Sequence, residues 1–136
     1  MKLPVSLAIL GLAVVCSVCG PAAAAGDSLK PSDKVALQAA MFQHIDSQLV
    51  NGAFLRLNAK EGRSEPLAPT KSHPMILRMG ENFVLCSDFR GADGKDVNID
   101  FYMARAGTKY VVFHTEVGNR TPLEQMMSSG KAQPID

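Results

Sequence analysis

The sequence lacks the short motifs by which many enzymes and metal proteins are recognised. It contains no Gly-x-Ser-x-Gly nucleophile motif and no glycine-rich phosphate loop. Its histidines, His44, His73 and His114, are far apart, whereas zinc motifs bring ligands together at close local spacing. The sequence therefore predicts no metal and no cofactor. It favours a protein that is not an enzyme, although the polar positions described below keep that question open.

An excess of charge is also missing. The full chain has 14 basic and 13 acidic residues, and removal of the leader described next takes away Lys2, which leaves 13 of each sign. No run of lysine and arginine is present. A nucleic-acid partner would need a basic patch. The composition thus argues against nucleic-acid binding and gives no electrostatic reason for membrane binding.

Long hydrophobic runs are limited to the N-terminus. Lys2 precedes an apolar run at residues 7–18, and three alanines at residues 23–25 match a small-x-small cleavage site. The run is too short for a transmembrane span. We predict a signal peptide at residues 1–25, cleaved near Ala25, and a periplasmic or secreted mature protein with no transmembrane segment.

Cysteine is scarce in the predicted mature chain. Cys16 and Cys19 lie in the leader, and a lipoprotein would use one of them. Each follows a valine, where lipidation sites favour small residues, which argues against that alternative. Cys86 then stands alone and cannot form an internal disulfide. It is expected to be a small buried hydrophobe, and the alternatives are a reactive thiol or an intermolecular bridge.

The stretch from residue 83 to residue 117 contains three segments in which apolar and polar residues alternate. Residues 83–89, 97–103 and 110–117 place most of their apolar side chains at odd positions, among them Phe89, Phe101 and Phe113. A period of two is typical of a β-strand with one buried face. We therefore predict three antiparallel strands whose odd positions share the core face.

Two odd-length connections fix the predicted register. A three-residue loop at residues 106–108 pairs Phe101 with Phe113, and a loop centred on Gly94 pairs Phe89 with Ile99. The opposite face then collects the polar residues in rows. The first row is Asp88, Asp100 and His114, the second is Arg90, Asn98 and Glu116, and the third is Cys86, Tyr102 and Val112.

Helical periodicity comes before and after these strands. An amphipathic helix is predicted from Ser32 or Asp33 to just before Asn51-Gly52, and a short helix at residues 121–129 precedes a solvated tail. Further strands are predicted at residues 53–58 and 75–79, and the proline-rich residues 64–74 are an edge strand or a loop. The predicted core stripe of the first helix is Val35, Ala39, Phe42, Ile45 and Leu49.

This order of elements predicts a single α+β domain over residues 26–136. One long N-terminal helix packs on a four- or five-stranded antiparallel sheet, and a short C-terminal helix follows. The layout resembles the cystatin-like and nuclear transport factor 2-like folds in element order. The Gln-x-Val-x-Gly hairpin of the cystatin protease inhibitors is absent, so the resemblance implies a shape and no activity.

The first polar row carries the catalytic hypothesis. Two carboxylates, Asp88 and Asp100, beside His114 would suit general acid–base work in a small hydrolase or isomerase. The alternative is an ordinary wet sheet face with balanced charges.

The other rows carry the binding hypothesis, which we favour. Tyr102, Arg90 and Glu116 are the predicted ligand-binding residues. The expected partner is a peptide, a small ligand, another protein or a second copy in a homodimer. An edge strand at residues 53–58 or 110–117 would accept a partner strand.

Overall fold

The computed structural model describes residues 28–135, so the predicted leader lies outside the described residues. Within these residues it is an α+β protein, as predicted, but with seven antiparallel strands where the sequence predicted four or five. The strand order is β1-β2-β3-β4-β5-β6, and β7 pairs with β3. The elements are α1 (Pro31–Gln48), β1 (Leu49–Val50), β2 (Ala53–Asn58), β3 (Arg63–Met79), β4 (Asn82–Gly91), β5 (Asp96–Ala106), β6 (Lys109–Val117), α2 (Thr121–Ser128) and β7 (Gln133–Ile135).

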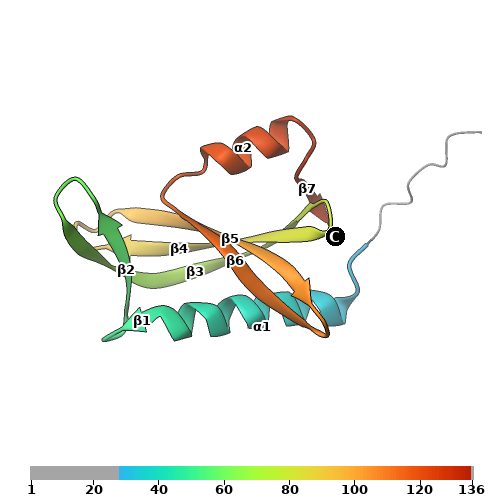
Figure 1. The fold of residues 1–136 in the computed structure, drawn as a ribbon, viewed down its shortest axis with the longest axis horizontal. Helices are drawn as coiled ribbons and strands as arrows, with labels where there is room; N and C mark the ends of the chain where they lie inside the picture. Colours follow the sequence, from blue (N-terminus) through green and yellow to red (C-terminus); the bar gives the residue numbers. More distant parts are fainter. Residues whose placement is uncertain (1–27, 136) are drawn as a thin grey trace, which may run out of the picture.

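The two helices lie on opposite sides of the sheet, α1 beneath it and α2 above it in Figure 1. The main core lies between α1 and the sheet, and a smaller apolar cluster lies on the α2 side. Among residues 28–135, neither helix is long and apolar enough to cross a membrane. The described residues form a single domain.

Helix α1 is shorter at its C-terminal end than predicted, because residues 49–50 form β1, and it buries a different stripe. Leu37, Met41 and Ile45 are its buried residues, whereas Val35 is 65 % exposed and Phe42 is also exposed. The sequence offers two overlapping apolar stripes that share Ile45, both with helical spacing, and packing on the sheet selects the one that contains Leu37 and Met41. The prediction of Val35 and Phe42 as core residues was therefore wrong.

The predicted helix cap also has another role. The helix begins at Pro31, and its N-cap residue Lys30 makes no side-chain capping hydrogen bond. Asp33 Oδ1 instead accepts hydrogen bonds from the Tyr110 hydroxyl at 3.0 Å and from Arg105 Nη2 at 3.1 Å. The Tyr110 and Arg105 hydrogen bonds hold the pKa of Asp33 below its ordinary value. This contact ties the start of α1 to the β5–β6 hairpin, beside the strand that α1 approaches most closely.

The β4–β5 hairpin has the predicted odd-length connection, displaced by one residue. Residues 92–94 form the loop, because Gly91 donates its amide to the Lys95 carbonyl at 2.9 Å. Phe89 consequently pairs with Val97, and not with Ile99. The displacement shifts every pair by two residues, which preserves the faces and changes the rows.

The β5–β6 hairpin differs in kind from the prediction. Its loop has two residues, Gly107 and Thr108, and Ala106 pairs with Lys109. An irregularity then separates the pairs of Val112 and His114, so that Phe113 is an extra residue, a β-bulge. Val112 packs against the main core, whereas Phe113 is 54 % exposed with its ring 6.5 Å from that of Tyr102, on the other face. Phe101 and Phe113 therefore do not share a face.

The second face of the sheet, which is the side away from α1, is half apolar. Helix α2 covers it at one end through Leu123, and the predicted solvated tail forms β7 against β3. The apolar patch predicted around Tyr102 and Cys86 is present, but Val112 is not part of it. The buried cluster consists of Leu77, Val84, Cys86, Tyr102, Leu123 and Ala132.

The proline-rich segment is part of β3, a strand of 17 residues. Its outer edge is paired with β2 through residues 63–67 and with β7 through residues 76–78. Between them, residues 68–75 have no partner on that side among the described residues. Pro69 and Pro74 fall in this gap, which suits a residue that cannot donate to a strand ladder.

Candidate functional site

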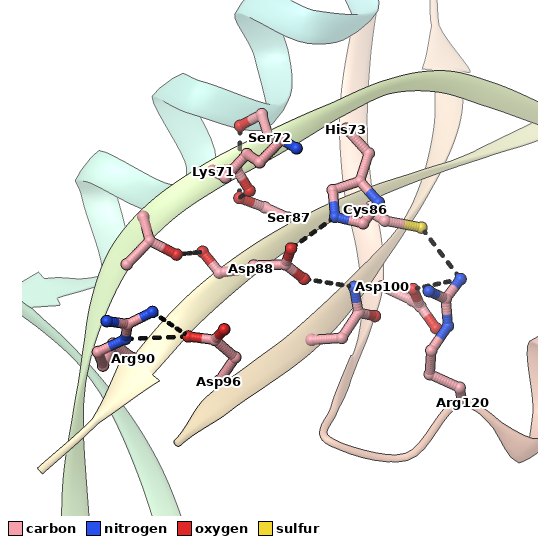
Figure 2. A network of polar contacts seen from close by, with 12 residues as sticks. Lys71, Ser72, His73, Cys86, Ser87, Asp88, Arg90, Asp96, Asp100 and Arg120 are labelled. Carbon is pink, nitrogen blue, oxygen red and sulfur yellow. Dashed lines mark hydrogen bonds and ion pairs between the residues drawn. The ribbon is translucent and has the colours of Figure 1, made fainter. Parts of the chain in front are cut away.

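Asp88 is the centre of a hydrogen-bonded group on the open half of the second face (Figure 2). It lies on β4, where its Oδ2 is 2.7 Å from His73 Nε2 on β3 and its Oδ1 accepts from Asn98 Nδ2 on β5 at 3.1 Å. The hydrogen bonds from His73 and then from Asn98 lower the pKa of Asp88 below the ordinary aspartate value. The group is partly exposed, and each oxygen of the Asp88 carboxylate has a hydrogen-bond partner.

Asp100, one strand further along, is in a contrasting environment. It is 1 % exposed, and register places it between Cys86 on β4 and Glu116 on β6. Arg120, in the connection to α2, brings Nη2 to 3.6 Å from Oδ1. Neither carboxylate oxygen has a hydrogen-bond partner among the described residues. Burial raises the pKa of Asp100, although the Cys86 thiol and the Arg120 charge oppose that shift.

Cys86 is buried, as expected, and unsuited to be a nucleophile. Burial, followed by the neighbouring Asp100, raises the pKa of its thiol to about 12. A reactive cysteine needs the thiolate, which electropositive surroundings favour. Arg120 donates to Sγ at 3.6 Å, but its charge does not offset the burial.

His114 pairs with Tyr102 across β5 and β6, with their ring centroids 5.3 Å apart. Its Nε2 lies 3.0 Å from Glu116 Oε1 on the same strand. Asp88 pairs with Asn98 and Asp100 with Cys86 and Glu116, so the three predicted catalytic residues occupy three different rows. The predicted row Asp88–Asp100–His114 is not formed, because the β4–β5 loop is displaced and β6 contains a bulge.

The predicted ligand-binding residues are likewise separated. Arg90 lies at the end of β4, where it forms an exposed ion pair with Asp96 at 2.7 Å. Tyr102 is buried in the cluster under α2, and its hydroxyl has no hydrogen-bond partner among the described residues. Glu116 faces Asp100. The structure brings no two of Tyr102, Arg90 and Glu116 into one row.

Two residues of this face, His73 and Arg120, were not anticipated from the sequence. His73 lies in the proline-rich segment, whose long strand pairing gives no clear alternation, and Arg120 lies in a connection. A possible signal was that each is the only imidazole or guanidinium in its own irregular segment. Sequence reasoning cannot say which face such a side chain reaches.

Two hollows of the surface lie around the β4–β5 loop, and one of them reaches Arg120, the residue just before α2. The larger one has a volume of about 310 Å³ and mixed charge. None of Asp88, Asp100 and His114 lines it. Its lining residues are Arg56, Asp93, Lys95, Asp96, Val97, Asn98, Gly118 and Arg120.

The edge strand β6 is the other candidate for binding. It pairs with β5, and the described residues include no second strand partner for it. Val111 and Phe113 on it are 44 % and 54 % exposed. Lys109 and Glu116 provide a positive charge near one end and a negative charge near the other. The strand thus offers unpaired backbone groups next to exposed apolar side chains.

Comparison with protein families, with curated proteins and with solved structures finds no match. Among the described residues, no group of three or more histidine, cysteine, aspartate and glutamate side chains is arranged to hold a metal ion. The interpretation of function therefore depends on the geometry of the chain itself.

Proposed function

We propose that the protein is an exported binding module that accepts an extended polypeptide segment along the outer edge of β6. The observation that carries this proposal is a nine-residue edge strand with exposed Val111 and Phe113 and only one strand partner among the described residues. A segment added to such an edge gains main-chain hydrogen bonds, and alternate side chains give it specificity.

The apolar and charged residues of β6 define the class of segment. Val111 and Phe113 favour an apolar centre in the partner strand, since their exposed side chains would be covered by it. Lys109 near one end and Glu116 near the other favour a partner with an acidic residue opposite the first and a basic residue opposite the second. The segment is therefore a short strand with an apolar middle and one charge of each sign at its ends.

Export and the finer fold description belong to the same proposal. The signal-like residues 1–25 support a periplasmic or secreted location. The order of one N-terminal helix followed by an antiparallel sheet supports a cystatin-like layout, with more strands than predicted. A hydrolase or isomerase is not carried forward, because its hypothesis required Asp88, Asp100 and His114 in one row.

The probe for this proposal is a fluorescently labelled peptide with the sequence of residues 109–117, which has the required apolar centre and terminal charges. Fluorescence anisotropy should show saturable binding to the protein. Phe113→Lys, which places a charge at the centre of the edge, should weaken binding at least about tenfold.

The matched control is Leu57→Lys on β2, a strand at the other side of the sheet, where Leu57 is 75 % exposed. This variant should bind the peptide as the wild type does, and thermal unfolding should confirm that both variants fold. Absence of peptide binding, or equal loss in both variants, would contradict the proposal.

A further inference from the structure

Four buried oxygen atoms on β5 have no hydrogen-bond donor among residues 28–135. They are Oδ1 of Asn98, both carboxylate oxygens of Asp100 and the hydroxyl of Tyr102. The three residues alternate along β5, so their side chains follow one another on the second face. Buried polar groups are nearly always hydrogen-bonded, so a row of unpaired acceptors indicates a position for a ligand that is rich in donors.

Asp100, the middle residue of this row, lies opposite a second acid. It is 1 % exposed and pairs with Glu116 across β5 and β6. Like charges at opposed positions of a ladder repel each other. Glu116 Oε1 lies 3.0 Å from His114 Nε2, so this acid already has a partner. The donor that suits Asp100 is therefore a cation, which also offsets the repulsion between the two carboxylates.

Arg120 covers Asp100 without satisfying it. Figure 2 shows its guanidinium reaching Cys86 and Asp100 from the connection before α2. Its Nη2 is 3.6 Å from Asp100 Oδ1, which is an ion-pair distance but too long for a hydrogen bond. The same nitrogen donates to Cys86 Sγ at 3.6 Å. Arg120 thus offsets the charge of Asp100 and leaves the carboxylate oxygens without a well-placed donor.

We propose that Asp100 is the binding position for a guanidinium group from outside the chain, which displaces the Arg120 guanidinium from it. A planar carboxylate with both oxygens unpaired accepts two parallel N–H donors from a guanidinium, and the other N–H groups face the acceptors of Asn98 and Tyr102. An ammonium is a compact charge without this fork, so it is a poorer match. Because Arg120 makes no hydrogen bond to Asp100, a guanidinium that makes two binds more strongly.

The hollow beside Arg120 gives the displaced side chain a place. Arg120 is 36 % exposed and lines the hollow of about 310 Å³, together with the carboxylates of Asp93 and Asp96. Gly118, which lines the same hollow, has a φ of 67°, where a residue without a side chain is favoured. Rotation of the Arg120 side chain toward these carboxylates uncovers Asp100 and leaves the strand pairing unchanged.

The inference rests on the proposed function, since it names the basic residue of the segment that binds at β6. Glu116 is on the edge strand, and Asp100 is its partner one strand further in. A basic side chain opposite Glu116 therefore follows the row toward Asp100, across two strand spacings of about 4.8 Å each. This reach suits the long side chain of arginine, and the segment carries arginine at that position.

The test is titration with N-acetyl-L-arginine amide, followed by calorimetry and by the amide NMR shifts of β5. Arg120→Ala removes the internal competitor and should lower the Kd of the probe at least about tenfold relative to the wild type. Asp100→Asn in the Arg120→Ala background should remove saturable binding. The corresponding amide of citrulline, which has the same shape without the charge, should not bind, and that of lysine should bind more weakly than the arginine probe.

Two further variants control for folding and for charge. Arg120→Lys keeps a cation beside Asp100 and should also bind the probe more tightly than the wild type, because an ammonium is the weaker competitor. Arg63→Ala removes a different arginine, whose ion pair with Glu61 is exposed, and should leave the Kd unchanged. Equal binding of the arginine and citrulline probes, or tight binding that persists after Asp100→Asn, would overturn the inference.

The outcomes also separate this inference from the function on which it rests. If the labelled peptide of residues 109–117 binds through Phe113 while the arginine probe fails to bind Arg120→Ala and Arg120→Lys, the Asp100 position is overturned and strand binding at β6 is retained. If the arginine probe binds as expected and no peptide binds at β6, Asp100 is a site for free guanidino compounds, and its assignment to a bound segment is overturned.

Discussion

Asp88 and Asp100 lie on neighbouring strands and on the same face of the sheet, and their pKa values are shifted in opposite directions. Asp88 is partly exposed and accepts hydrogen bonds from His73 and Asn98, so its charged form is favoured. Asp100 is buried, and burial disfavours its charged form even though the Arg120 guanidinium lies 3.6 Å away. The comparison shows that the local donors and water around a carboxylate, more than its position on a strand face, decide its chemistry.

The largest effect is expected at Arg120, whose removal leaves Asp100 buried beside the Cys86 thiol without its cation. Arg120→Ala should lower the free energy of unfolding at neutral pH by about 2 kcal/mol, less than a fully buried pair because the guanidinium is 36 % exposed. Urea denaturation measures this change. Arg90→Ala is the control, since Arg90 and Asp96 are both well exposed, and it should change stability by no more than about 0.5 kcal/mol. Equal effects at the two sites would mean that Asp100 does not need a cation.

A smaller effect of opposite sign is expected from Asp100→Asn, which removes the buried charge and keeps the shape of the side chain. At pH 7 the variant should be more stable than the wild type by about 1 kcal/mol.

The pH dependence of this difference follows from the raised pKa of Asp100. The folded state holds the proton where the unfolded state, near its ordinary pKa of 3.8, has lost it. Stability of the wild type therefore falls as pH rises from near 3.8 through the raised pKa, and the variant lacks this decline. Denaturation curves at several pH values should show the two proteins converging in acid. In the Asp100→Asn background, Arg120→Ala should cost almost nothing, and a persistent cost would assign Arg120 a separate role in holding α2.

Much of the fold follows from the sequence because alternation and helical periodicity are local. The strands at residues 83–89 and 97–103 and the core positions of Phe89 and Phe101 are where the pattern predicts them. The rows across the sheet depend on loops and bulges, which a one-residue change can alter. Asp93-Gly94 predicts a turn but not which residue is its centre, and nothing in the run from Tyr110 to Val117 marks Phe113 as the extra residue.

The candidate site was less predictable than the fold for the same reason. Its rows join three strands. Because the β4–β5 loop is displaced by one residue, the cross-strand partner of Asp88 is Asn98 and not the predicted Asp100. The His73 and Arg120 contacts come from an irregular strand and a connection, where no periodicity indicates a face. The prediction of the buried face of α1 was wrong because Met41 and Phe42 are adjacent and both apolar. Only packing against the sheet determines which of the two is buried. Predictions from pattern were reliable within one strand and unreliable between strands.

The smallest effect on stability is expected at Asp88, the more exposed of the two aspartates. Asp88→Asn should cost about 0.5 kcal/mol at neutral pH, because the His73 contact is partly exposed and the amide retains some hydrogen bonding. Its pH dependence has the opposite sign to that of Asp100. The lowered pKa of Asp88 means that its contribution is present above the ordinary aspartate value of 3.8 and is lost as pH falls through the folded value. The wild type should therefore lose its advantage over Asp88→Asn in acid, as measured by denaturation curves at matched pH values.

His73→Gln should remove most of the same advantage, whereas His114→Gln, whose Glu116 contact is separate, should leave it intact. If His114→Gln removed it as well, the two imidazoles would belong to one coupled network, and the separation of rows described above would not hold in solution.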